Sequence, residues 1–110
     1  MMINNPFSID NIAPDLSRFE TKSVNVIYRA QQTGYVVMYA NPRWDGLALI
    51  RIANNEQMNA GTIMFLTGGS YYDNENESGA GNTLIKKGDY FRIEGPRIQW
   101  IRFIPCVGAK

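Results

Sequence analysis

The sequence predicts an all-β protein, an antiparallel β-sandwich or jelly roll of about seven to eight short strands. Short runs rich in β-branched and aromatic residues recur along the chain, and Gly, Pro, Asn or Asp residues separate them. No stretch of about 12 residues keeps the 3.6-residue apolar period of an amphipathic helix. The chain has 110 residues, of which 45% are hydrophobic, as expected for a single domain with one core. We expect an N-terminal arm at residues 1–13, a possible docking segment, and one sandwich domain at residues 14–110.

The strand predictions follow the chain in order. Residues 1–23 are polar and interrupted by prolines, so we expect an irregular segment with a short turn between Asp15 and Phe19. Alternating or β-branched runs then predict strands at 23–30, 35–39, 47–52, 62–67, 83–85, 90–93 and 98–104. Residues 71–82, YYDNENESGAGN, are polar and glycine-rich, and we expect them to form a long exposed loop.

The closing strand, residues 98–104, is apolar on both of its faces. Period-2 alternation places Ile98, Trp100 and Ile104 on one face and Ile101 and Phe103 on the other. A strand that is half exposed to water should show one polar face, so we expect this strand to be covered on both sides. One side would face the core. The other would pack against another copy of the chain in a trimer, or lie beneath a loop or the N-terminal arm.

The sequence contains no histidine and a single cysteine, Cys106. The absence of histidine excludes Ser-His-Asp and Cys-His catalysis as well as histidine metal sites. One cysteine cannot form an internal disulfide or a structural zinc site, and we expect Cys106 to be buried and unreactive. We therefore expect no enzymatic activity and no cofactor.

The formal net charge is +1, which predicts no overall attraction to nucleic acid or to an anionic membrane. The last third is locally basic, but its spacing matches no nucleic-acid-binding module, and Asp89 and Glu94 dilute the charge. We expect neither nucleic-acid binding nor membrane insertion. The N-terminus has no basic start followed by an apolar stretch, which argues against a signal peptide. A lone cysteine fits synthesis in a reducing compartment such as a bacterial cytoplasm.

Two loops carry the richest contact chemistry. In residues 41–46, NPRWDG, Trp44 stands between Arg43 and Asp45, a combination that can stack on a sugar ring and bind its hydroxyls. The alternative is that Trp44 covers the end of the sandwich or packs at a subunit contact. In the second loop, Tyr71, Tyr72 and Asp73 are candidate ligand contacts.

The second loop also has acidic residues at alternate positions, Asp73, Glu75 and Glu77, as at the start of a calcium loop. However, Ser78 and Leu84 stand where that loop requires Gly and a bidentate Glu. A solvated loop tip is the alternative, and cation binding stays open.

Several segments, taken in order, resemble the C-terminal knob domain of tailed-bacteriophage tail fibres. The pattern begins with Pro14 and Asp15, although Leu16 follows where an aromatic residue is common. The resemblance covers roughly residues 13–109. Its remaining positions are Tyr28, Ala30, Gly34, Tyr35 and Val36, then Lys86, Lys87, Gly88 and Asp89, and finally Phe103, Pro105 and Gly108.

The resemblance implies a small trimeric β-sandwich that carries a receptor-binding surface. We therefore expect a virion protein, a tail-fibre or spike tip made in the bacterial host cytoplasm. Its partners would be its own copies as a homotrimer, other virion proteins, and a glycan or protein on the host surface. Because the chain starts shortly before the resemblance does, we expect a free-standing knob. The alternatives are a stand-alone carbohydrate-binding, lectin-like module and a small phage-encoded inhibitor of a host protein.

Overall fold

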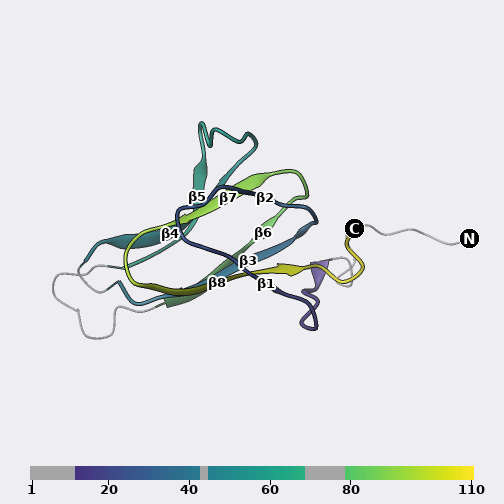
Figure 1. Cartoon of the computed structure of the whole chain (residues 1–110), viewed down its shortest axis with the longest axis horizontal. Coiled ribbons are helices and arrows are strands. Elements are labelled where there is room, and N and C mark those ends of the chain that lie inside the picture. Colours follow the sequence, from purple (N-terminus) through teal and green to yellow (C-terminus); the bar gives the residue numbers. More distant parts are fainter. Residues whose placement is uncertain (1–11, 43–44, 69–78) are drawn as a thin grey trace, which may run out of the picture.

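The computed structural model describes residues 12–42, 45–68 and 79–110, which form eight strands in two antiparallel sheets (Figure 1). The predicted all-β sandwich is confirmed in this part of the chain. The strands are β1 (Glu20–Thr21), β2 (Tyr28–Arg29), β3 (Gly34–Ala40), β4 (Leu47–Ala53), β5 (Thr62–Gly68), β6 (Gly79–Ile85), β7 (Tyr90–Glu94) and β8 (Ile98–Pro105).

The strands pair in a nested order. Sheet 1 has the order β1-β8-β3-β6, and sheet 2 has the order β2-β7-β4-β5. Thus β1 pairs with β8, β2 with β7, β3 with β6 and β4 with β5, as if one long hairpin had been rolled into two sheets. The closing strand β8 consequently lies inside sheet 1, between β1 and β3. This position explains why the C-terminal residues are so apolar.

The core lies between the two sheets. Phe91 from sheet 2 stacks on Phe103 from sheet 1 with ring centroids 6.0 Å apart, and Tyr28 stacks on Phe91 at 5.3 Å. Burying a large apolar side chain of this kind contributes roughly 1.5–3 kcal/mol. The buried cluster comprises Ala30, Val36, Met38, Ala40, Ala48, Ile50, Ile85, Phe91, Ile93, Ile101 and Phe103.

The two faces of β8 differ from the prediction at one position. Ile101 and Phe103 point into the core, whereas Trp100 is only half-buried on the outer face of sheet 1. Ile98, which simple alternation places with Trp100, packs against the core instead. The reason is a register shift: Trp100 pairs with Tyr39 and Ile98 with Ala40, so Gln99 is an extra residue that inverts the alternation.

The strand predicted at 23–30 is shortened to β2, because the backbone of Asn25 has a φ of 62° and cannot continue an extended strand. Val24, Val26 and Ile27 are therefore exposed. The turn expected near Asp15 is confirmed, since the Arg18 amide donates a hydrogen bond to the Asp15 carbonyl at 3.0 Å.

The last four residues of the expected loop 71–82 form a strand instead, and residues 71–78 lie outside the described residues. Residues 79–82 belong to β6 and pair with β3, from Gly79 opposite Ala40 to Asn82 opposite Val37. The glycines that suggested a loop have a packing role here. A Cβ on Gly81 would overlap the Phe65 ring, and a Cβ on Gly79 would lie 2.6 Å from Thr67 Oγ1. Small residues in β6 therefore let β5 close over this side of the sandwich.

Candidate functional site

The described residues that flank the two loops selected from the sequence lie at the same end of the sandwich. The loop after β3 begins next to Ala40, which pairs with Gly79, and it ends at Leu47, which pairs with Gly68. Gly68 and Gly79 flank the second loop. The strand pairing therefore places the roots of both loops together, although about 30 residues separate them along the chain.

The turn between β7 and β8 joins the same end. The Asn41 amide donates to the Arg97 carbonyl at 3.0 Å. We name this region the loop end, which comprises the described residues 41, 42, 45, 46, 68, 79 and 95–97. In Figure 1 the β7–β8 turn lies at the left, and the C-terminus lies at the right. At the C-terminal end of the sandwich, Pro14 forms an isolated bridge with Cys106.

Arg97 holds the two ends of the 41–46 loop. Its Nε donates to the Asn41 carbonyl at 2.8 Å, and its Nη1 lies 3.5 Å from Asp45 Oδ2. Both side chains of the ion pair are more than 40% exposed (43% and 44%), so the pair itself is worth about 0–1 kcal/mol. The Arg97 backbone has a φ of 58°, which turns the chain sharply into β8. Sequence reasoning did not assign this role to Arg97, because only the fold brings it to Asn41.

Asn41 adds a polar group at the root of this loop. Its Oδ1 atom is buried and has no hydrogen-bond partner among the described residues. Buried polar atoms without a partner are uncommon in folded proteins. The loop end therefore contains a buried hydrogen-bond acceptor that no described residue satisfies, next to the buried ring of Pro42.

Of the predicted site residues, the structure places Asp45, which is exposed and paired with Arg97. Arg43, Trp44, Tyr71, Tyr72 and Asp73 lie outside the described residues, as do Glu75 and Glu77. Sugar stacking by Trp44 and cation binding by the acidic loop stay predictions. Within the described residues, no three His, Cys, Asp or Glu side chains are grouped so that they could hold a metal ion.

The outer face of sheet 1 carries a second group of aromatic side chains. Tyr39 and Trp100 stack with ring centroids 6.2 Å apart. The Arg102 guanidinium lies over both the Phe19 and the Trp100 ring, with its Cζ atom 4.7 Å and 4.8 Å from the respective ring centroids. Beside them is an open groove of about 220 Å³. It is lined by Pro14, Leu16, Tyr35, Val37, Asn82 and Ile104. The segment leading into β1 thus covers part of this face, as one of the two alternatives for β8 predicts.

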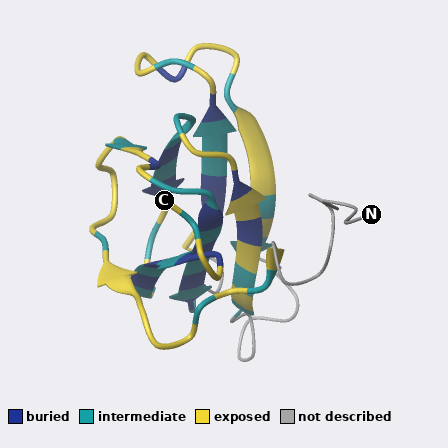
Figure 2. Ribbon diagram, turned by 90° about the vertical axis from the view of Figure 1, so that its right-hand side faces the viewer, coloured by how far each residue is buried: buried dark blue, intermediate teal, exposed yellow. Residues whose placement is uncertain are grey.

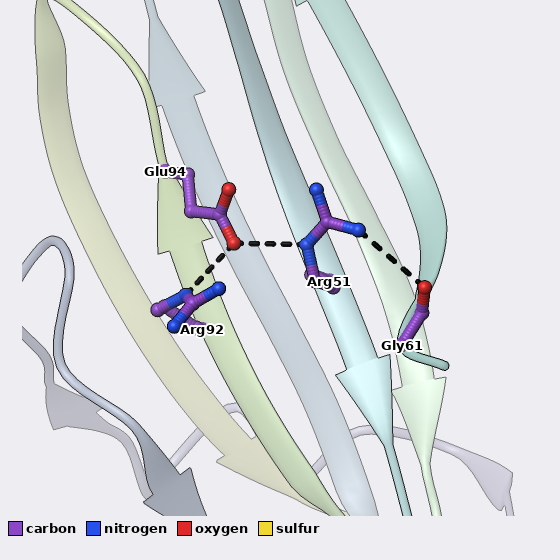
Figure 3. A network of polar contacts seen from close by, with 4 residues as sticks. All are labelled: Arg51, Gly61, Arg92 and Glu94. Carbon is purple, nitrogen blue, oxygen red and sulfur yellow. Dashed lines mark hydrogen bonds and ion pairs between the residues drawn. The ribbon is translucent and has the colours of Figure 1, made fainter. Parts of the chain in front are cut away.

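A charged network lies on the outer face of sheet 2 (Figure 3). Glu94 Oε2 accepts hydrogen bonds from Arg51 Nε at 2.9 Å and from Arg92 Nε at 2.8 Å. Arg51 Nη1 also donates to the Gly61 carbonyl at 3.4 Å, which connects the β4–β5 loop to the sheet. Partial burial raises the pKa of Glu94, but the hydrogen bonds from both arginines outweigh it, and the pKa is lowered overall. Sequence reasoning missed this network, since Arg51 meets Arg92 only through the β4–β7 register.

The basic residues of the last third do not form one surface. Arg92 lies on sheet 2, Arg102 on sheet 1 and Arg97 at the loop end, while Lys87 Nζ donates to the Lys110 carbonyl at 2.9 Å. Cys106 is buried as predicted, and burial raises the pKa of its thiol.

In the part of the chain that the structure describes, no helix has the length and apolar character needed to cross a membrane. Comparison with known proteins gave no matching family model, no matching curated protein and no matching solved structure.

Proposed function

We propose that this chain is a bacteriophage virion protein, the trimeric tip of a tail fibre or spike, and that its loop end binds a structure on the host cell surface. The observation that carries the proposal is the common position of the two loops. The described residues that flank both loops lie at one end of the sandwich, and residues 12–14 and 106–110 lie at the other. A tip needs this polarity, because one end must attach to the virion while the other meets the receptor.

The strand order supports a jelly roll as the finer description of the fold. Nested pairing across two four-stranded sheets is how a rolled hairpin of eight strands is built. Such a scaffold is rigid, and its loops can vary without loss of the core. The order of motifs from Pro14 to Gly108, which resembles tail-fibre knobs, adds the viral context.

The mechanism would be avidity. Three equivalent loop ends on one rigid trimer would face the same surface, and each would bind weakly. Once one site is bound, the others act at a high effective concentration, so modest single-site affinity becomes firm attachment. Arg97 contributes by fixing both ends of the 41–46 loop through Asn41 and Asp45. A loop that is held in place loses less conformational entropy on binding.

The experiment is adsorption of fluorescently labelled protein to a panel of bacterial strains, with the variants Trp44→Ala and Tyr35→Ala compared. Loss of an aromatic anchor at the loop end should cost on the order of 2 kcal/mol per site, or about 30-fold, and more in a multivalent tip. Tyr35→Ala is the matched control, because Tyr35 pairs with Leu84 and Ile104 at the end of sheet 1 that lies away from the loop end. Trp44→Ala should therefore abolish adsorption, whereas Tyr35→Ala should retain it.

The proposed receptor surface is wrong if Trp44→Ala and a Gly-Ser replacement of residues 73–78 both adsorb like the wild type. Further measurements separate the alternatives. Binding to isolated glycans by a protein that is absent from purified virions would favour the lectin-like module. Capture of one soluble host protein without cell adsorption would favour the inhibitor.

A further inference from the structure

We infer that Arg51 and Arg92, on the outer face of sheet 2, bind an oxyanion: the phosphate or carboxylate group of an acidic glycan. Glu94 occupies part of the same site from within the chain. The site lies on strands and outside the two loops, so it goes beyond the proposed receptor surface and depends neither on those loops nor on the trimer.

Strand pairing places the two arginines directly opposite each other. Arg51 in β4 pairs with Arg92 in β7. Their neighbours Ile50, Phe91 and Ile93 are buried in the core, so both arginines lie on the outer face, and Figure 2 shows the same alternation of buried and less buried positions along the strands. Like charges directly opposite each other destabilise a sheet. The chain therefore keeps a repulsive pair at two positions that the core does not need.

Glu94 balances only one of the two positive charges. Its Oε2 atom accepts hydrogen bonds from both Nε atoms, at 2.9 Å from Arg51 and 2.8 Å from Arg92. Neither arginine has another ion pair among the described residues, so two positive charges and one negative charge leave a net charge of +1. A singly charged oxyanion would neutralise this charge and relieve the remaining repulsion.

The guanidinium groups keep terminal nitrogens for such a ligand. Glu94 is bound through the Nε atoms, and Figure 3 shows the two guanidinium groups on either side of its carboxylate. Arg51 Nη1 donates to the Gly61 carbonyl at 3.4 Å, whereas no described residue accepts a hydrogen bond from the terminal nitrogens of Arg92. Both side chains reach solvent, with 27% and 31% of their surface exposed. The planar edge of a guanidinium matches two oxygens of a carboxylate or phosphate.

The size of the site favours one anionic group over a polyanion. A protein surface that binds nucleic acid neutralises several phosphates at once. Here one pair of arginines, already sharing a carboxylate, offers a single contact. A glycan with an isolated phosphate or uronate group carries the matching charge.

The test follows the Nε–H signals of Arg51 and Arg92 by nuclear magnetic resonance. Sodium phosphate or sodium glucuronate replaces sodium chloride at constant ionic strength, so that general screening does not change. At least one of the two anions should shift both signals and saturate, with a dissociation constant roughly in the millimolar range. Tighter binding of phosphate identifies a phosphorylated glycan as the ligand class, and tighter binding of glucuronate identifies a uronate.

Variants at the three positions give changes of opposite sign. Glu94→Gln should raise the affinity for the anion at least about fivefold, because a competing negative charge is removed. Arg92→Gln should lower it at least about tenfold, and Arg92→Lys should also lower it, since lysine keeps the charge but loses the planar edge. Arg102→Gln is the matched control and should bind like the wild type, because Arg102 lies on the outer face of sheet 1. Circular dichroism verifies that each variant is folded.

Three results would overturn the inference. The first is a set of signals that do not saturate with either anion. The second is an Arg92→Gln protein that binds like the wild type, with Arg92→Lys deciding if Arg92→Gln does not fold. The third is a Glu94→Gln protein that binds no tighter than the wild type, which would make the three side chains a purely structural network. Adsorption through the loop end is measured separately, so either result can fail without the other.

Discussion

Gly81→Ala gives the sharpest test of how the sandwich closes. Gly81 lies in the middle of β6, where its backbone has no positive φ and an alanine would meet no backbone strain. Backbone propensity alone therefore predicts that the free energy of unfolding rises by about 0.4–1 kcal/mol, because alanine lowers the conformational entropy of the unfolded chain. The structure predicts the opposite sign, since the new methyl group would overlap the Phe65 ring of β5.

The magnitude follows from these two opposing effects. Inserting a methyl group into a packed contact costs roughly 1–3 kcal/mol through forced rotamers and backbone shifts. After the gain in propensity is subtracted, the free energy of unfolding should fall by about 1–2 kcal/mol. With a urea m-value of about 2 kcal/mol/M, the midpoint should fall by roughly 0.5–1 M at unchanged slope.

A double-mutant cycle identifies the contact. Phe65→Leu shortens the side chain above Gly81, so Gly81→Ala should cost much less in the Phe65→Leu background than in the wild type. The coupling energy should be about 1 kcal/mol or more, as expected for residues in contact. Gly81→Ala proteins that are more stable than the wild type, or additive effects in the cycle, would refute the close approach of β5 to β6.

Two further predictions concern the strand faces. Phe103→Ala should lower the free energy of unfolding by about 3–5 kcal/mol, because Phe103 is 4% exposed in the core, whereas Trp100→Ala should cost about 1–2 kcal/mol through lost stacking and cation–π contacts. Chemical denaturation of both variants checks this order, and the reverse order would mean that β8 faces the other way. Glu94→Gln should cost about 1 kcal/mol at pH 7. Because the pKa of Glu94 is lowered in the folded state, its contribution is present above the unfolded pKa of about 4.3 and is lost as the pH falls through the folded value. The wild-type and Glu94→Gln melting temperatures should therefore converge at acidic pH, and a gap that stays constant would contradict the network.

The sequence alone determined the class of fold and most strand positions. Strand formation depends on local composition and period-2 alternation, which can be read directly from the residues. The segment Gly34–Ala40 alternates buried and half-buried positions without interruption, as its sequence predicts. The burial of Cys106 follows from the same local reasoning, whereas the sequence did not show which face of β8 enters the core.

Only the tertiary structure decided which segments meet. The nested pairing joins β1 to β8 across most of the chain, and no local pattern encodes a partner so far away. The register of the pairing then determined which side chains face the core and where a strand begins, which period-2 alternation alone does not show. One extra residue at Gln99 moved Ile98 to the core, and pairing with β3 made a strand of the glycine-rich residues 79–82. Strand pairing also brought the residues that flank two separate loops to one end. The β4–β7 pairing placed Arg51 beside Glu94, because side-chain contacts across a sheet depend on which residues lie opposite each other.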